Sequence, residues 1–343
     1  MNARQGFVGT SVERREDSRF LTGAGNYTDD ITLPGQTYAY FLRSPYAHAR
    51  IKSLDTTAAA AAEGVLGIFT GEHFKAVGGL PCGWLINNID GTPMKEPKHP
   101  VLAHGKVRYV GDRVALVVAE TLDQAKAAAE LIEVDYEELP AVADTAGALA
   151  PGAGQVHPEA PGNLAFDWHY GDEAGVAAAF AKAARVVKLE LVNNRVICNA
   201  MEPRACVAEW DAAAGKLTLQ TGTQGVWMPR NILAASLGLE PEQVRVTTGD
   251  VGGGFGMKAF FYPEYSMAGY AARALGRPVK WTGERGESFL SDTMGRDHVT
   301  MAQVAFDADH RILGLKVDLI ANMGAYYFAF APYIPTGAAL KVL

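Results

Sequence analysis

A run of glycines between residues 249 and 258, Gly-Asp-Val-Gly-Gly-Gly-Phe-Gly-Met-Lys, constrains the fold of this chain more than any other stretch. It follows an apolar, strand-like run at 244–248 and precedes a helix-like run that opens near Pro263. Adjacent glycines lose much conformational entropy on folding, so they persist where the backbone needs unusual dihedrals or a close approach. Successive bare N–H groups at a strand end form a concavity that suits an anion or an oxo group. The run therefore predicts a binding loop or tight strand–helix packing.

The spacing of this glycine run excludes the two common phosphate-binding signatures. A P-loop has a glycine directly before its lysine, whereas Met257 precedes Lys258 here. The dinucleotide fingerprint has glycines at positions i, i+2 and i+5, but Gly252 and Gly254 are followed by Met257 at the third position. A nucleotide-binding protein is therefore a weak alternative. Taken alone, a run of this kind is typical of a tight packing loop.

Length and composition indicate a globular protein of about two domains. The 343 residues include 48% hydrophobic and 20% charged side chains. The net charge of −7 is the opposite of the basic face that nucleic acid requires, so we expect no nucleic-acid partner. No apolar run reaches the roughly 18 residues of a membrane span, and the polar N-terminus through Arg19 lacks the apolar core of a signal peptide. We expect a cytoplasmic protein with no membrane partner.

The three cysteines, Cys82, Cys198 and Cys206, show no C-x-x-C spacing. Iron–sulfur clusters and structural zinc sites are held by cysteines at such short spacings. We therefore expect neither centre in this chain and interpret the three thiols as inert.

Residues 1–140 are predicted to form a first domain, with an irregular lead-in over residues 1–36. Apolar runs predict strands and alanine-rich amphipathic runs predict helices. The strands are expected at 37–43, 65–70, 114–119 and 134–136, and the helices at 58–63 and 122–132. Thr121 and Gln124 match the capping box that begins a helix. The last two strands and the helix between them would make a β-α-β unit.

A stretch rich in alanine, glycine and proline, residues 141–164, is the predicted linker. Residues 165–343 would form a second domain. Its predicted helices run from an Asp172 cap to Val187, from 230 to 237 and from 265 to 275, and its predicted hairpins pair 205–210 with 217–221 and 299–306 with 312–320. The chain ends in apolar sequence at 338–343, which is typical of a truncated chain or of one part of a split subunit.

Short sequence blocks occur in a defined order along nearly the whole chain. They are Arg-Ser-Pro at 43–45 with His-Ala at 48–49, Val-Arg-Tyr-Val-Gly-Asp at 107–112, Val-Val-Ala-Glu-Thr at 117–121, Met-Glu-Pro at 201–203, Thr-Gln at 223–224, the glycine run, and Arg-Pro-Val-Lys-Trp at 277–281 with Glu-Arg at 284–285. Each block is weak alone, whereas the ordered set resembles the large, molybdenum-binding subunit of the xanthine dehydrogenase, aldehyde oxidase and aerobic carbon monoxide dehydrogenase family. The resemblance implies an α+β chain: an N-terminal α/β hammerhead domain, then the first, incomplete half of a mixed α+β molybdopterin-binding domain.

The resemblance also implies which residues meet the cofactor. A glutamine that hydrogen-bonds an oxo ligand of molybdenum in the family matches Gln224, and the Phe-Gly whose backbone packs against the metal site matches Phe255 and Gly256. Gly253 and Gly254 belong to the same cofactor-binding loop. Gln224 and Phe255 would then contact the molybdenum centre without being direct ligands. A neutral amide donor can hold an oxo group without adding charge, and glycines let main-chain N–H groups approach a bulky anionic complex.

Cofactors and partners follow from the same resemblance. The implied cofactor is molybdenum–molybdopterin in its pterin dinucleotide form, with iron–sulfur clusters and FAD on partner subunits. Those partners would be an iron–sulfur small subunit and an FAD medium subunit, in a dimer of heterotrimers. The chain would be part of a molybdenum hydroxylase that oxidises a small organic substrate with water-derived oxygen. The family's catalytic glutamate would lie beyond Leu343, so we expect no catalytic residue in this chain and no activity from the chain alone.

One departure from the family pattern bears on the substrate. Purine-oxidising members carry a glutamate directly after the loop lysine, where this chain has Ala259. Loss of a carboxylate that hydrogen-bonds a polar ring favours an aldehyde over a purine. Lys258 is expected to pair with a nearby carboxylate, and Glu202 is expected to be structural. The alternative function is a non-catalytic half-subunit that only assembles with a companion chain carrying the catalytic loops.

Overall fold

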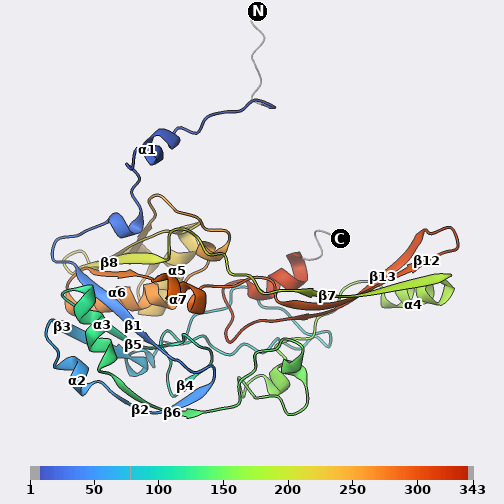
Figure 1. The fold of residues 1–343 in the computed structure, drawn as a ribbon, viewed down its shortest axis with the longest axis horizontal. Coiled ribbons are helices and arrows are strands. Elements are labelled where there is room, and N and C mark those ends of the chain that lie inside the picture. The colour runs from blue at the N-terminus through green and yellow to red at the C-terminus, as the bar shows by residue number, and fades with distance from the viewer. Residues whose placement is uncertain (1–7, 78, 339–343) are drawn as a thin grey trace, which may run out of the picture.

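A computed structural model describes residues 8–77 and 79–338, and the strands of this part of the chain form three sheets. A seven-stranded sheet has the order β10-β9-β8-β11-β1-β5-β3, and two three-stranded sheets have the orders β4-β2-β6 and β13-β12-β7. Figure 1 shows a compact body from which the sheet of β7, β12 and β13 extends as a long ribbon, with helix α4 lying along it.

The strands and helices have the following bounds. The strands are β1 Thr37–Arg43, β2 Ala49–Asp55, β3 Val65–Thr70, β4 Lys106–Val107, β5 Arg113–Ala119, β6 Glu133–Glu138, β7 Arg185–Asn193, β8 Ala205–Asp211, β9 Lys216–Thr221, β10 Val244–Thr247, β11 Val279–Thr282, β12 His298–Phe306 and β13 Ile312–Ala321. The helices are α1 Asp17–Leu21, α2 Thr57–Ala60, α3 Leu122–Glu130, α4 Glu173–Lys182, α5 Trp227–Leu237, α6 Pro263–Leu275 and α7 Arg285–Ser291. Among the described residues, no helix has both the length and the apolar character needed to cross a bilayer.

The seven-stranded sheet takes strands from both predicted domains. Strands β3, β5 and β1 come from the first, and β11, β8, β9 and β10 come from the second. The seam is the parallel pairing of β1 with β11, in which Thr37 lies opposite Val279. The proposed division into residues 1–140, a linker at 141–164 and residues 165–343 stays a prediction, because one sheet is shared across it.

The core of the large sheet follows from local sequence. Strand β5 is apolar after Arg113 and buried along its whole length, as expected for a central strand covered on both faces. The capping box of α3 is confirmed: the backbone N–H of Gln124 donates to Thr121 Oγ1 over 3.2 Å, and that of Thr121 donates to Gln124 Oε1 over 3.1 Å. Both predicted hairpins are confirmed as antiparallel pairs, β8 with β9 and β12 with β13. Helices α5 and α6 end at glycines in the left-handed conformation, as predicted.

Three local predictions were wrong in extent or partner. Strand β6 does not share a sheet with β5, because it pairs antiparallel with β2. Its sequence, Glu-Val-Asp-Tyr-Glu-Glu, alternates polar and apolar side chains and so suits a half-exposed antiparallel sheet. Helix α4 ends at Lys182, and Val187 lies in β7 because the β-branched run after Arg185 favours a strand. Helix α2 is one turn that ends at Ala60.

A parallel β-α-β unit does exist, but it lies at β9, α5 and β10. Strands β9 and β10 pair in parallel, with Gln220 opposite Thr247, and α5 connects them. The carboxyl ends of parallel neighbours meet at one edge of a sheet. The segments that follow β9 and β10 are therefore brought to the same place.

A buried carboxylate, Glu264 on α6, lies against three arginines from separate strands. Its Oε1 lies 3.0 Å from Arg43 Nη2 and 3.6 Å from Arg113 Nη1, and its Oε2 lies 3.2 Å from Arg204 Nη1. Arg43 ends β1, Arg113 begins β5 and Arg204 directly precedes β8. The Glu264 side chain is completely buried, so this cluster holds three strands and a helix in fixed relation.

The charges of this cluster determine the ionisation of its carboxylate. Burial opposes the ionisation of Glu264, but the combined field of Arg204, Arg113 and Arg43 holds its pKa well below the ordinary value of 4.5. A carboxyl whose pKa is lower in the folded state contributes stability above its unfolded pKa. That contribution should be lost as the pH falls below about 4.5 towards the folded pKa.

We predict that Glu264→Gln lowers the free energy of unfolding by about 3–5 kcal/mol, because three buried guanidinium groups lose their shared counter-charge. The measurement is urea denaturation followed by circular dichroism. Glu242→Gln is the matched control, since that side chain is 80% exposed beside Arg230, and it should cost less than about 1 kcal/mol. Equal stability of the two variants would contradict the structural role of Glu264.

Candidate functional site

The structure brings Gln224 and the glycine run together at the edge where β9 and β10 end. Gln224 lies between β9 and α5, and the glycine run lies between β10 and α6. The backbone N–H of Gly256 donates to Gln224 Oε1 over 2.9 Å. The backbone N–H of Gln224 donates to the carbonyl of Lys258 over 3.0 Å. The two elements that the family resemblance pairs are therefore in direct contact, while their role in cofactor binding stays a prediction.

The side-chain amide of Gln224 presents its donor group away from this contact. Because Oε1 accepts from Gly256, the Nε2 group keeps its two N–H donors for another partner. Over residues 8–77 and 79–338, no protein acceptor is hydrogen-bonded to that nitrogen. The side chain is also exposed. A fixed, neutral, accessible donor is what an oxo group or another acceptor requires.

Two glycines in the loop are needed for different physical reasons. A Cβ at Gly254 would lie 2.5 Å from Gln224 Oε1 and 2.7 Å from its Cδ, so any side chain there would push the Gln224 amide out of its present position. Gly256 has a φ of +88°, a backbone conformation that side-chain-bearing residues rarely adopt. Gly253, with a φ of +102°, lies on the other side of Phe255. The glycine run is thus shaped around the Gln224 amide.

Phe255 has an unusual environment for an aromatic residue. Its side chain is 74% exposed, and its φ of +53° lies in the left-handed region. Non-glycine residues in that region are uncommon and often occur at functional sites. The Cys198 thiol donates to the Phe255 carbonyl with 3.5 Å between sulfur and oxygen, which helps to fix the loop backbone. An exposed ring on a strained, anchored loop is consistent with a group that packs on it.

The buried Lys258 and the partly buried Glu202 form a brace behind the glycine run. Lys258 Nζ donates to Glu202 Oε2 over 2.6 Å, and the backbone N–H of Gly252 donates to the same oxygen over 2.8 Å. The backbone N–H of Glu202 donates in return to the carbonyl of Gly252 over 3.0 Å. Burial lowers the pKa of Lys258, although Glu202 opposes that shift. The predicted pairing of Lys258 with a carboxylate is confirmed, and Glu202 has the structural role expected of it.

The start of the loop is held by a contact that the sequence does not indicate. Asp250 binds the guanidinium group of Arg19, with Nη2 2.7 Å from Oδ1. The backbone N–H of Asn26 donates to Asp250 Oδ2 over 2.7 Å. The Arg19 hydrogen bond, together with the Asn26 N–H, lowers the pKa of Asp250 to about 2. The lead-in, predicted as irregular, therefore anchors the stem of the glycine run.

A second supporting segment, residues 198–201, lies behind the loop. Arg285 Nη1 donates to Asn199 Oδ1 over 2.8 Å, and Nη2 donates to the carbonyl of Ala200 over 2.7 Å. A Cβ at Gly253 would lie 3.3 Å from the Cβ of Ala200, so this segment touches the loop. The only sequence signal for the contact was the presence of Glu284-Arg285 among the resembling blocks.

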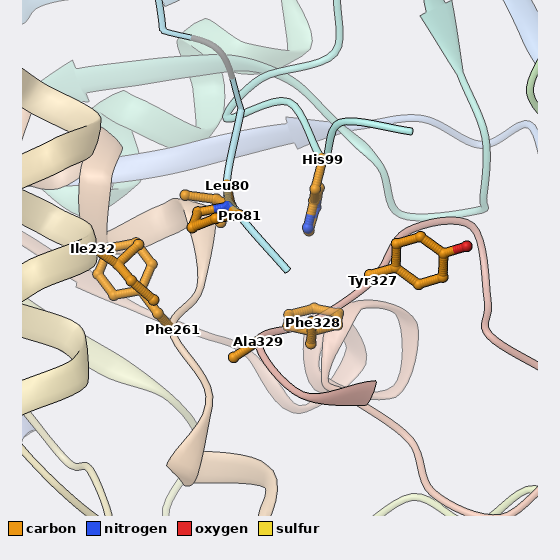
Figure 2. A pocket seen from close by; sticks show the side chains of 8 residues that line it. All are labelled: Leu80, Pro81, His99, Ile232, Phe261, Tyr327, Phe328 and Ala329. Atoms are coloured by element: carbon orange, nitrogen blue, oxygen red, sulfur yellow. The ribbon is translucent and has the colours of Figure 1, made fainter. Parts of the chain in front are cut away.

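An apolar cavity lies apart from the glycine loop and belongs to the core (Figure 2). It is lined by Leu80, Pro81, His99, Ile232, Phe261, Tyr327, Phe328 and Ala329. Arg113 Nη2 donates to His99 Nε2 over 2.9 Å, and burial holds the pKa of that imidazole well below its usual value. Neither Gln224 nor residues 253–256 line the cavity, so the candidate site is the loop surface rather than this space.

The residues at the loop fit the implied cofactor as outer contacts. They offer an amide donor, bare main chain and an exposed ring, and these groups suit a bulky, acceptor-rich anion. Within the part of the chain that the structure describes, no cluster of three or more His, Cys, Asp or Glu side chains could hold a metal ion. The three cysteines are free, with Cys82 and Cys206 buried. This arrangement would surround a metal–oxo group without ligating the metal.

We predict that Gly254→Ala displaces the Gln224 amide and breaks its hydrogen bond with the Gly256 N–H, at a cost in stability of about 0.5–1.5 kcal/mol. Gly225→Ala is the matched control, since its Cβ would meet nothing within 4 Å and it adjoins the same glutamine. The measurements are urea denaturation and the side-chain NH₂ resonances of Gln224. If Gly254→Ala leaves both unchanged, the glycine is not shaped around Gln224.

Comparison with known proteins agrees with the family resemblance that the sequence blocks indicated. The family model for the aldehyde oxidase and xanthine dehydrogenase a/b hammerhead domain matches residues 22–140, and that for the molybdopterin cofactor-binding domain matches residues 156–343. The chain is 38% identical over 337 residues to the 6-hydroxypseudooxynicotine dehydrogenase complex subunit gamma of Paenarthrobacter nicotinovorans, covering 96% of this chain and 41% of that protein. It is 35% identical to the carbon monoxide dehydrogenase large chain of Hydrogenophaga pseudoflava, covering 91% and 39%.

A solved structure has the same fold over most of the chain. Quinoline 2-oxidoreductase from Pseudomonas putida 86 is 37% identical, with a TM-score of 0.81 over 93% of this chain and 40% of that one. The chain thus spans about two fifths of the length of the relatives it matches. With a hammerhead domain followed by molybdopterin-binding sequence, the chain belongs to the xanthine dehydrogenase and aldehyde oxidase family of molybdopterin-binding oxidoreductases.

Proposed function

We propose that this chain supplies part of the cofactor cradle of a molybdenum hydroxylase that oxidises a small organic substrate. The observation that carries the proposal is the contact between the Gln224 amide and Gly256, beside the exposed ring of Phe255. When bound, a molybdenum–pterin group would supply the Lewis acidity and two-electron redox chemistry for hydroxylation with water-derived oxygen. The parts of the site on this chain bind and orient that group.

The proposed roles follow from the geometry of each residue. Gln224 Nε2 donates a hydrogen bond to an acceptor atom of the cofactor and adds no charge. The bare main chain at Gly253, Gly254 and Gly256 permits an approach that side chains would block. Phe255 packs its backbone and ring against the group. The brace of Glu202 and Lys258 keeps the loop in place, so little reorganisation is needed when the group binds.

We predict that Gln224→Ala in the assembled, metal-loaded enzyme lowers kcat by about 10²–10³, as the loss of a single fixed donor does in other active sites. Gln303→Ala, on β12 in a different sheet, is the matched control and should leave kcat unchanged. The assay measures turnover per bound molybdenum, so loss of metal is separated from loss of rate. Full activity of Gln224→Ala at full molybdenum content would refute the assigned role.

We further propose a small substrate of low polarity, with an aldehyde favoured over a purine. Ala259 lies directly after the braced Lys258, in the short 3₁₀ turn Met257–Ala259, where its methyl group offers no hydrogen bond to a polar ring. A site without such a partner binds a polar heterocycle less well. The names of the relatives span a nicotine derivative, carbon monoxide and quinoline, so family membership leaves the substrate open.

We predict that the assembled enzyme oxidises benzaldehyde faster than hypoxanthine. Ala259→Glu should reduce the ratio of kcat/KM for benzaldehyde to kcat/KM for hypoxanthine, because the new carboxylate can bind a purine ring. Ala259→Gly is the control for a change in size alone. Values of kcat/KM for both substrates provide the comparison. Faster oxidation of hypoxanthine by the unsubstituted enzyme would end the preference for an aldehyde.

The electrons removed from the substrate need an acceptor outside this chain. Two of its three cysteines are buried and no two have the C-x-x-C spacing, which does not suit a cluster site. We therefore propose an iron–sulfur small subunit and an FAD medium subunit as partners, in a cytoplasmic dimer of heterotrimers, with the pterin in its dinucleotide form. Mass spectrometry of the purified complex, with iron, flavin and nucleotide analysis, tests each part of this proposal.

A second candidate function is a half-subunit that assembles with a companion chain carrying the catalytic loops. Both candidate functions are compatible with a match that covers 41% of the relative from Paenarthrobacter nicotinovorans. Under both proposals, the hydroxylase part and the half-subunit, residues 1–343 alone should be inactive, because the expected catalytic glutamate is not among them. Molybdenum-dependent turnover by the purified 343-residue chain would contradict that expectation.

A further inference from the structure

A carboxylate lies at the start of the glycine run, the loop to which the proposed function assigns an anionic group. Asp250 is two residues before Gly252, so their Cα atoms are at most about 7 Å apart. The Debye length at physiological ionic strength is about 8 Å, so a charge on Asp250 acts on the main-chain N–H groups of the loop. The pKa of about 2 means that this carboxylate is ionised near neutral pH. An unpaired Asp250 would therefore repel an anion from the loop.

The charge of Asp250 is neutralised by a residue 231 positions earlier in the chain. Arg19 donates to both carboxylate oxygens, from Nη2 to Oδ1 over 2.7 Å and from Nη1 to Oδ2. Over residues 8–77 and 79–338, Arg19 is the only cation within 4 Å of this carboxylate. A planar guanidinium group that contacts both oxygens of a carboxylate forms one of the stronger ion pairs in proteins. Neutralisation of Asp250 thus depends on one side chain of the lead-in.

Helix α1, which carries Arg19, has little packing of its own. None of its residues, Asp17–Leu21, is buried, and Figure 1 shows the helix standing off the body of the molecule. The stem of the loop also has a second anchor. The backbone N–H of Asn26 donates to Asp250 Oδ2 over 2.7 Å, and that of Asp250 donates to the carbonyl of Asn26 over 3.1 Å. Because an ion pair with a half-exposed arginine contributes little to stability, anchoring alone does not explain Arg19.

The other carboxylate beside the loop is paired in the same way. Glu202 accepts from the N–H of Gly252, and Lys258 Nζ lies 2.6 Å from the same carboxylate oxygen. Asp250 and Glu202 therefore each have one cation. Main-chain N–H groups attract an anion through partial charges only, so one uncompensated carboxylate at this range would oppose them. The contacts around the loop leave neither carboxylate uncompensated.

We propose that Arg19 is a positioning residue for the cofactor, and that it acts by neutralising Asp250 so that the glycine loop can accept an anionic group. The inference rests on the proposed function, because the anion is the molybdenum–pterin group. It also differs from simple anchoring. An anchor requires the ion pair itself, whereas charge compensation requires only that no free carboxylate remains. The two explanations therefore differ for an uncharged side chain at position 250.

The test measures how fast the assembled protein, purified from its native host, loses molybdenum and pterin during dialysis at low ionic strength. Arg19→Ala leaves Asp250 unpaired, and we expect a loss about two- to twenty-fold faster. That factor is the effect of one unit charge about 10 Å from another, between the dielectric of water and that of a protein surface. Salt at about 1 M should reduce the difference by screening. Arg14→Ala, which removes a lead-in arginine that pairs with Asp17, is the matched control and should change nothing.

The decisive variants change position 250. Asp250→Asn removes the charge but keeps an acceptor oxygen for the N–H of Asn26. We expect Asp250→Asn to retain the cofactor as the unsubstituted protein does, and the double variant of Arg19→Ala with Asp250→Asn to regain the retention lost in Arg19→Ala. Arg19→Lys should also retain the cofactor, because it keeps the charge. Since Asp250→Asn is measured by itself, poor folding of Arg19→Ala would not decide the result.

Three results would overturn the proposal. Rapid loss of cofactor from Asp250→Asn would show that the ion pair is only an anchor, as would equal loss from the double variant and from Arg19→Ala. Unchanged retention in Arg19→Ala at low ionic strength would show that the charge of Asp250 is not felt by the cofactor. An unsubstituted protein that binds no molybdenum–pterin would overturn the proposed function, and this inference with it, so the two failures are distinguishable.

Discussion

The carboxylate of Glu264 and the three arginines around it fix the geometry on which the rest of this structure depends. Arg43 and Arg113 come from the first part of the chain, while Arg204 directly precedes β8 in the second. Arg204 lies two residues after Glu202, whose carboxylate holds Lys258 and the backbone of Gly252. The short segment from Glu202 to Arg204 therefore connects the arginine cluster at the seam of the seven-stranded sheet to the support of the glycine loop. Leaving any one of these charges unpaired would be costly at low dielectric.

Local sequence was enough to predict most of the elements, because strand propensity, capping and terminal glycines act over a few residues. The bounds of β1 and β3, the capping box at Thr121 and the helix end at Gly276 are examples. Partner choice was not predictable in the same way. The sequence of β6 shows that one face of that strand is exposed, but its pairing with the distant β2, in which Leu54 lies opposite Val134, depends on tertiary packing.

In the candidate site, too, the local sequence predicted the loop, whereas the contacts between distant segments could be found only in the structure. The glycine run was visible at once, and the resemblance indicated Gln224 and Phe255, but their meeting depends on the parallel pairing of β9 with β10. The ion pair between Arg19 and Asp250 joins residues that are 231 positions apart, and no local sequence pattern indicates it. The sheet of β7, β12 and β13 could not be interpreted from sequence either. Its strands alternate apolar and polar side chains as any half-buried strand does, and only the structure shows that α4 packs on one of its two sides.

An experimental structure of the assembled protein with its cofactor bound is the most direct measurement of the central claim, that Gln224 and the glycine loop together cradle the group. The account predicts that Gln224 Nε2 lies about 3 Å from an acceptor atom of the cofactor. It also predicts that the main chain of Phe255 and Gly256 packs against the metal centre. A cofactor bound elsewhere, with the Gln224 amide facing solvent, would contradict the account.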